Sequence, residues 1–185
     1  IGCDHYYLGE SKIASNVKSI RHSVVALHYP ETAPDGLPTV NDVVHSFSAR
    51  PSGRVSLVGV GEEEEVNADD YNQGIDPDTG AMTLSSVSKR LPSMTGATVA
   101  GGWSGLFTVT PDWHPVLGKI PEIGGLYCAT GFSGHGFKLS PMVGVVMSEL
   151  VTSGVSTSID VSTLGIGRFA TGDLLQSSYG MRVLA

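Results

Sequence analysis

GLYCATGFSGHGFKLSP, residues 125–141, is the stretch that decides the fold, because it joins three structural signals in one run. Residues 125–130 are typical of a buried strand. Three glycines follow within 131–136, where the backbone must approach something closely without side chains in between. Pro141, together with Gly154 beyond the far end, predicts a helix over residues 141–151. We expect the buried face of this helix to consist of Met142, Val145, Val146, Glu149 and Leu150.

The loop of residues 131–138, between this strand and this helix, is the candidate site. A helix N-terminus directs its free N–H groups and the positive end of its dipole at the preceding loop, which suits an anion or an electron-rich carbonyl. His135 adds a titratable ring, and Lys138 adds a fixed positive charge. A flat heteroaromatic ring that becomes anionic on reduction would fit such a loop. The alternative is a glycine-rich turn that carries two polar surface residues.

Outward from this loop, the sequence predicts short strands and a second helix. Runs of β-branched and apolar residues predict strands at 23–29, 43–49, 55–60 and 106–110. The second and third of these should form a hairpin through a turn at 51–53. Asp76 and Pro77 predict the start of an amphipathic helix that ends at Pro92. Its apolar face should consist of Met82, Leu84, Val87 and Leu91. The tail beyond Ser156 is rich in Ser, Thr and Gly and has only weak patterning.

The composition is that of a globular protein with a hydrophobic core. The 185 residues are 41% hydrophobic and 16% charged, and 11 basic against 18 acidic residues give a net charge of −7. This balance excludes wholesale disorder and argues against binding to a nucleic-acid backbone. Cys3 and Cys128 are isolated, as in a reducing compartment, and neither a membrane span nor a signal peptide is recognisable. We therefore expect a cytoplasmic location.

Motifs for other chemistries are weak. Gly59-Val60-Gly61 begins like a dinucleotide fingerprint, but Glu64 stands where the third glycine belongs. The acidic run Glu62–Glu65 is expected to be a solvated loop rather than a cation site. The histidines lack metal-ligand spacing, so no metal is expected. Ser133 lacks the spacing of a hydrolase nucleophile elbow.

Two stretches together carry a resemblance to a known family. They are WSGLFTVTPDWHPVLG, residues 103–118, and the run 125–141 quoted above. Their order and spacing resemble the C-terminal part of FAD-dependent amino-acid and amine oxidoreductases of the D-amino-acid oxidase superfamily, in the sarcosine oxidase and proline dehydrogenase-like branch. Residues 16–61 are similar in pattern to the strands of that family's substrate domain. The resemblance covers roughly residues 16–154.

The resemblance implies a fold and a domain division. The fold class is α+β, with a mostly antiparallel substrate-domain sheet and the C-terminal strand-loop-helix of an FAD-binding Rossmann-like domain. Residues 1–15 would be a lead-in or truncated edge, 16–100 part of the substrate domain, and 101–155 the last segment of the FAD-binding domain. Residues 156–185 would be a tail.

The resemblance also implies roles for single residues. The family oxidises a C–N bond by hydride transfer to FAD, and the cofactor carries that chemistry. The residues implied to contact FAD are Gly131, Phe132, Ser133, Gly134, His135, Gly136, Phe137 and Lys138. Lys138 would lie near the substrate carboxylate and His135 beside the substrate pocket, as catalytic groups. Phe47 and Arg50 would face that pocket from a sheet strand. Some relatives attach FAD through a cysteine at the position of Gly105, so non-covalent FAD is expected here.

Two departures from the family pattern shape the functional hypotheses. The N-terminal dinucleotide fingerprint is absent, so the chain resembles the C-terminal portion of a longer or split enzyme. Alone it is expected to be inactive, and a missing dinucleotide-binding segment or subunit is its expected partner. No lysine occurs in residues 55–60, where oxygen-using relatives have one, which favours a dehydrogenase over an oxidase. A non-catalytic subunit or scaffold module, and a tetrahydrofolate-linked demethylating relative, remain as alternatives.

Overall fold

The computed structural model describes residues 7–8, 11–12 and 17–176, and the chain in it divides into two compact units. Residues 20–106 form one, here called the central unit, and residues 1–19 with 107–185 form the other, the terminal unit. Most of the predicted lead-in, including Cys3, lies outside the described residues. Its described part is the short antiparallel pair β1 (Tyr7–Leu8) and β2 (Ser11–Lys12).

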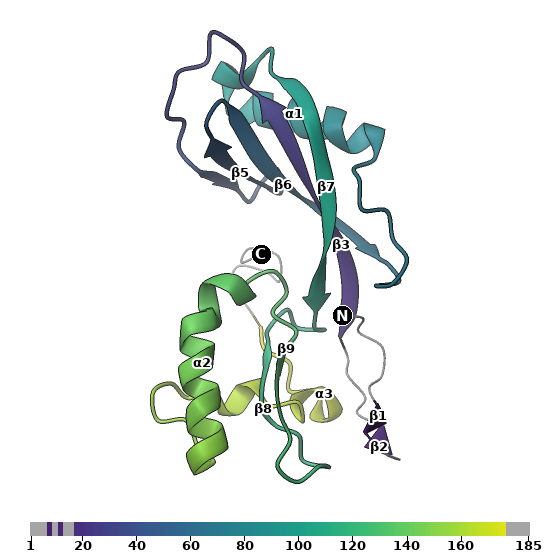
Figure 1. Ribbon diagram of the computed structural model, residues 1–185, viewed down its shortest axis with the longest axis vertical. Coiled ribbons are helices and arrows are strands. Elements are labelled where there is room, and N and C mark those ends of the chain that lie inside the picture. Colours follow the sequence, from purple (N-terminus) through teal and green to yellow (C-terminus); the bar gives the residue numbers. More distant parts are fainter. Residues whose placement is uncertain (1–6, 9–10, 13–16, 177–185) are drawn as a thin grey trace. The chain divides into compact units, whose positions relative to one another are not determined.

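A five-stranded sheet with the order β4-β5-β6-β3-β7 is the framework of the central unit (Figure 1). The strands are β3 (Lys18–His28), β4 (Val40–Asp42), β5 (Phe47–Ser52), β6 (Val55–Glu65) and β7 (Thr98–Val109). β5 and β6 form the predicted antiparallel hairpin, with Ser52 opposite Val55. β3 pairs antiparallel with β6, so Val25 lies opposite Val58. The antiparallel α+β character expected from the sequence is therefore confirmed.

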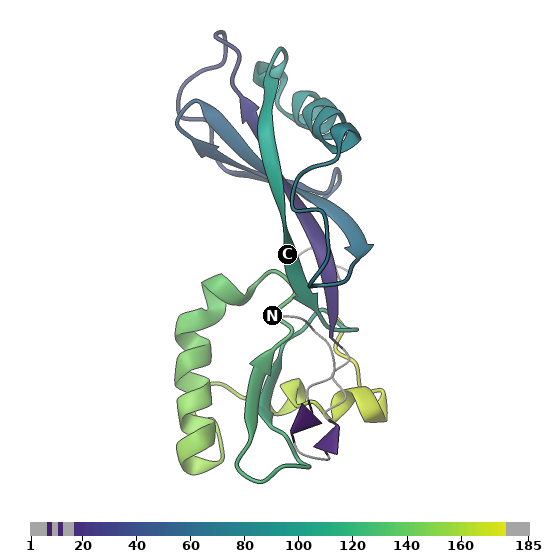
Figure 2. The ribbon, with the colours of Figure 1, turned by 45° about the vertical axis from the view of Figure 1, so that its right-hand side comes forward.

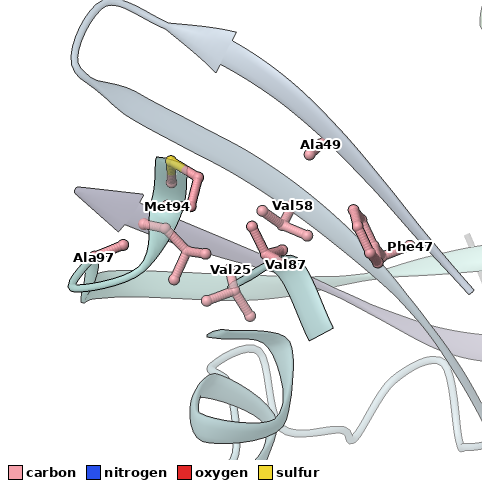
Figure 3. Packing of buried hydrophobic residues seen from close by; sticks show 8 residues of the cluster. Val25, Phe47, Ala49, Val58, Val87, Met94 and Ala97 are labelled. Atoms are coloured by element: carbon pink, nitrogen blue, oxygen red, sulfur yellow. The ribbon is translucent and has the colours of Figure 1, made fainter. Parts of the chain in front are cut away.

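The main hydrophobic core lies between one face of this sheet and helix α1 (Pro77–Arg90), which is followed by the short 3₁₀ helix η1 (Pro92–Met94). Figure 3 shows side chains of the sheet and of the helical segment converging there. The buried members are Val25, Leu27, Phe47, Ala49, Val58, Val87, Met94 and Ala97. Burial alternates along β3, so the opposite face of the sheet carries a separate set of side chains.

Helix α1 begins at Pro77 and ends before Pro92, as the sequence predicts. Its buried face differs from the expected one at Met82, which is 69% exposed. The helix instead turns small residues, Thr79, Gly80 and Thr83, toward the sheet. A Cβ at Gly80 would lie 3.4 Å from both methyl groups of Val99, so a small residue lets the helix approach the sheet closely.

The predicted strand at 43–49 begins four residues later, because Asp42 turns the chain first. Its carboxylate oxygen Oδ1 accepts the N–H groups of Val44 and His45, each at 2.9 Å. This local hydrogen bonding competes with strand formation and outweighs the β-propensity of two valines. Residues 43–46 consequently form a turn, in which Val44 is 82% exposed.

The acidic run 62–65, expected as a loop, instead belongs to β6. The buried guanidinium of Arg21, on the neighbouring β3, lies 3.3 Å from Glu64 and 2.7 Å from Asp76. It also donates to the carbonyls of Asn72 and Gly74. A cation on the adjacent strand reduces the repulsion between the carboxylates, so the strand continues to Glu65.

In the terminal unit, helix α2 (Gly136–Ser153) packs beside the hairpin of β8 (Val116–Lys119) and β9 (Tyr127–Thr130) (Figures 1 and 2). β8 is a strand that the sequence reasoning missed. The helix starts five residues before the predicted Pro141. Pro141 has no N–H for the carbonyl of Phe137, and the hydroxyl of Ser140 donates to that carbonyl instead, at 2.9 Å. Gly154 ends the helix at φ +80°, as expected.

The packed face of α2 also differs from the predicted one. Val146 is buried, with Val143, Met147 and Leu150 packed beside it, whereas Met142 and Val145 are exposed. Glu149 accepts the N–H groups of Thr157 at 2.9 Å and Ser158 at 3.1 Å, and hydroxyl groups of the same loop donate to it. These hydrogen bonds, above all those from Ser158, lower the pKa of Glu149 to about 2.

The tail contains η2 (Ser162–Leu164) and α3 (Arg168–Thr171) within its described part. Val161 and Leu164 join the small core of the terminal unit with Leu117 and Val146. Among the described residues, no helix combines the length and the apolar character needed to cross a bilayer.

Candidate functional site

The glycine-rich loop occupies residues 131–135, between β9 and α2. Helix α2 begins at Gly136, so Gly136, Phe137 and Lys138 form the first turn of the helix rather than the end of the loop. All eight residues of the predicted cofactor-contacting segment therefore belong to one continuous loop and helix start, within the terminal unit.

The glycines of the loop are required by close packing inside the protein. A Cβ at Gly131, where φ is +69°, would overlap the Cγ2 methyl of Thr110. A Cβ at Gly134, where φ is +89°, would lie 3.0 Å from the ring of Phe107. At Gly136 it would lie 3.1 Å from Phe132. The glycines thus let the loop backbone approach the end of β7 and the ring of Phe132 closely.

Ser133 fastens the loop to the end of β7. Its backbone N–H donates to the carbonyl of Thr108 at 2.9 Å, and its hydroxyl donates to the carbonyl of Gly131 at 3.2 Å. The same hydroxyl accepts the N–H of Thr110 at 3.5 Å. The residue is buried and has φ +48°, a conformation that side chains other than glycine seldom adopt. These contacts give Ser133 a structural role in shaping the loop.

The start of α2 is electropositive. His135 precedes the helix, and its Nδ1 atom lies 2.8 Å from the carbonyl of Phe132 instead of capping the first turn. That turn contains no acidic residue and includes Lys138, which is exposed, as is Phe137. N–H groups at a helix start, a dipole and a lysine together favour a negatively charged or electron-rich group. The arrangement fits the partly anionic edge of a reduced heteroaromatic ring.

Phe47 and Arg50, predicted to face one pocket together, point to opposite faces of the sheet. Residues three apart on a strand have side chains on opposite sides. Phe47 is buried in the core beneath α1, whereas Arg50 is exposed on the other face. The two side chains therefore lie on different faces of the sheet, and only Arg50 lies on the face that α1 does not cover. A substrate contact of either residue stays a prediction.

Sequence reasoning missed a buried ion pair between Asp112 and Arg168. Arg168 Nε lies 2.7 Å from Asp112 Oδ2, and Nη2 lies 3.0 Å from Oδ1. Burial alone would raise the pKa of Asp112, but hydrogen bonds from Arg168 and from the amides of His114 and Leu175 lower it to about 2. The one available signal was Arg168 itself, the single basic residue between Ser156 and Gln176.

The motif that resembles a dinucleotide fingerprint lies in a strand. Gly59, Val60 and Gly61 belong to β6, and the next helix in the chain begins only at Pro77. Within the described ranges, no three His, Cys, Asp or Glu side chains are grouped so as to hold a metal ion.

Comparisons with known proteins agree with the resemblance seen in the sequence. The family model described as "DAO: FAD dependent oxidoreductase" matches residues 6–150. "FAD-dependent oxidoreductase domain-containing protein 1" of Mus musculus is 30% identical over 152 residues, which are 80% of this chain and 31% of that protein. "Monomeric sarcosine oxidase" of Bacillus sp. (strain NS-129) is 36% identical over 111 residues, 54% of this chain and 28% of that protein.

A solved structure shares the fold. L-proline dehydrogenase from P. horikoshii superposes with a TM-score of 0.73 and 26% identity, over 86% of this chain and 42% of that one. The chain thus spans about a third of the length of the curated relatives it matches.

Proposed function

Because the chain belongs to the DAO family of FAD-dependent oxidoreductases, we propose that it forms part of an enzyme that oxidises the C–N bond of a small amino acid or secondary amine. The observation that carries this proposal is the glycine-rich loop that opens into an electropositive helix start. When bound, FAD supplies the chemistry by accepting a hydride from carbon, while the amine loses a proton to give an imine.

The residues of the loop would hold and polarise the flavin. N–H groups of the first turn of α2 would donate to the edge of the ring that gains negative charge on reduction. Lys138 would bind the substrate carboxylate and His135 would border the substrate. The other residues of the segment, Gly131 to Gly134, Gly136 and Phe137, would also contact the cofactor. Three of them are glycines and the side chain of Ser133 is buried, so these four would do so through backbone atoms. Arg50 is the candidate for a substrate contact on the sheet.

The partner of this chain would be a dinucleotide-binding part, as a preceding segment or a separate subunit. The chain covers only 31% of the length of the Mus musculus relative, and the sequence holds no fingerprint for the ADP half of FAD. Helix α2 has exposed apolar side chains on a face that β8 and β9 do not cover, namely Leu139, Met142 and Val145. Such a row is expected where another part of the protein packs.

Three finer predictions belong to the same proposal. Gly105 stands where some relatives carry the flavin-linking cysteine, so FAD would be non-covalent. The absence of lysine in residues 55–60 favours a dehydrogenase over an oxidase. The isolated cysteines favour a cytoplasmic location. The alternative, a non-catalytic subunit or scaffold, is favoured by the missing fingerprint and disfavoured by the intact loop.

Flavin absorbance tests the proposal in the protein joined to its dinucleotide-binding part. We expect visible flavin absorbance that bleaches when proline or sarcosine is added. After denaturation, the flavin should separate from the protein with the small molecules. A colourless protein would favour the scaffold alternative. Gly105→Cys is a matched probe, because a Cβ there meets nothing within 4 Å. That variant should fold normally, and flavin that stays attached after denaturation would place this position beside the ring.

A further inference from the structure

Arg168 in α3 uses all of its N–H groups in hydrogen bonds. It lies more than thirty residues after the glycine-rich loop in the sequence. Besides its two bonds to Asp112, it donates to the carbonyls of His114 at 2.7 Å, Leu164 at 2.9 Å and Gly165 at 3.2 Å. Both side chains of the ion pair are almost fully buried. A buried guanidinium held by a forked pair has one available position, so it can serve as a fixed anchor.

Asp112 passes this constraint to Thr110. Its Oδ1 atom accepts the hydroxyl of Thr110 at 3.2 Å and the N–H of His114 at 3.1 Å. The same hydroxyl lies 2.7 Å from the carbonyl of His114, its other possible acceptor. Asp112 and His114 therefore fix the rotamer of Thr110, which is itself buried.

Thr110 in turn contacts the loop. Its Cγ2 methyl fills the space where Gly131 lacks a side chain, and its N–H points at the hydroxyl of Ser133. A different rotamer would move the methyl away from Gly131 or force the loop to shift. The path Arg168, Asp112, Thr110, Gly131 lies wholly within the terminal unit.

We propose that Arg168 is a positioning residue that sets the conformation of the glycine-rich loop through Asp112 and Thr110. The proposal rests on the proposed function only for what the loop binds, and the conformational claim stands apart from it. Its physical basis is that each link is a buried hydrogen bond or a direct packing contact, so none can relax into water without cost.

Hydrogen exchange in the protein joined to its dinucleotide-binding part tests this claim. Arg168→Met should speed exchange in the peptide of residues 131–136 by about tenfold, because the Ser133 N–H to Thr108 bond opens more often. Exchange in residues 143–150 of α2 should stay unchanged. Arg54→Met is the matched control, because Arg54 ties carbonyls of Pro30 and Ala33 in the central unit. Hydrogen exchange in residues 131–136 should be unchanged in this variant.

Thr110→Val decides the question if Arg168→Met does not fold. It keeps the shape and the ion pair but removes the hydroxyl that links Thr110 to Asp112 and to the carbonyl of His114, which Arg168 also holds. It should give the same local acceleration at 131–136. Equal acceleration across the whole terminal unit, or none at the loop, would overturn the proposal. If the unaltered protein carries no flavin, the proposed function falls, while exchange at the loop still decides the role of Arg168. Where flavin is bound, its midpoint potential should shift in Thr110→Val and stay constant in Arg54→Met.

Discussion

Replacing Gly131 by alanine tests how the loop is seated on β7. The change adds one methyl group at φ +69°, where it overlaps Thr110 Cγ2. A left-handed conformation costs an alanine about 1–2 kcal/mol, and overpacking at a buried site adds about 1–3 kcal/mol. Thr110 is β-branched and held by hydrogen bonds, so it cannot swing aside cheaply. We expect Gly131→Ala to lower the free energy of unfolding by about 2–5 kcal/mol.

Gly125→Ala is the matched control, because Gly125 has φ +78° and nothing within 4 Å of a Cβ. It carries only the conformational part, about 1–2 kcal/mol, and the change in unfolded-chain entropy is the same for both variants. Urea unfolding should therefore give a difference of about 1–3 kcal/mol between the two variants, at an unchanged m-value.

A double variant separates the steric part directly. Thr110→Ser removes the Cγ2 methyl and keeps the hydroxyl, so in that background Gly131→Ala should cost little more than Gly125→Ala does. The coupling free energy should be about 1 kcal/mol or more. Equal costs at positions 131 and 125, or a coupling near zero, would refute the reasoning that Gly131 is required by Thr110.

Three further predictions concern the ion pair, the core and the loop. The pKa of Asp112 is about 2 in the folded protein, against an ordinary value of 3.8. Its carboxylate therefore contributes about 2 kcal/mol to the free energy of unfolding above pH 3.8, and this contribution is lost as the pH falls through 2. Acid unfolding should show this loss, and Asp112→Asn should abolish that part of the pH dependence. Met94→Ala should cost about 2–5 kcal/mol in thermal or urea unfolding, because Met94 is fully buried, whereas Met82→Ala on the exposed face of α1 should change stability by less than about 0.5 kcal/mol. In the flavin-loaded enzyme, Lys138→Ala should raise KM for a carboxylate substrate and perturb the flavin spectrum; unchanged values of both would remove Lys138 from the site.

The elements with local signals were predictable from the sequence. Pro77 and Pro92 delimit α1, and Gly154 ends α2, because proline and glycine impose their backbone conformations wherever they stand. The β5–β6 hairpin followed equally from its turn and flanking strands. The position of the candidate loop could be predicted too, since its glycines and the helix after it are consecutive in the chain.

The errors came where a side chain forms hydrogen bonds that its type does not announce. Asp42 accepts backbone N–H groups of a segment whose valines favour a strand, and the segment forms a turn. The hydroxyl of Ser140 donates to the carbonyl of Phe137, which Pro141 cannot reach with an N–H, and the helix continues through the proline. The acidic run belongs to strand β6, where Glu64 pairs with Arg21 of the neighbouring strand β3. Arg168 lies 56 residues from Asp112, and no local pattern could have paired them.

The separation of Asp112 from Arg168 has a consequence for biosynthesis. The central unit is one continuous segment, so all of its residues have left the ribosome before Arg168 is made. Asp112, in contrast, waits for a partner 56 residues downstream, which at about 5–20 residues per second is roughly 3–11 seconds of translation. During that interval Asp112 lacks the guanidinium with which it pairs in the folded unit. A chain that ends between residues 136 and 168 would thus carry the glycine-rich loop without the Asp112–Arg168 ion pair, a form that proteases and chaperones can distinguish from the completed chain.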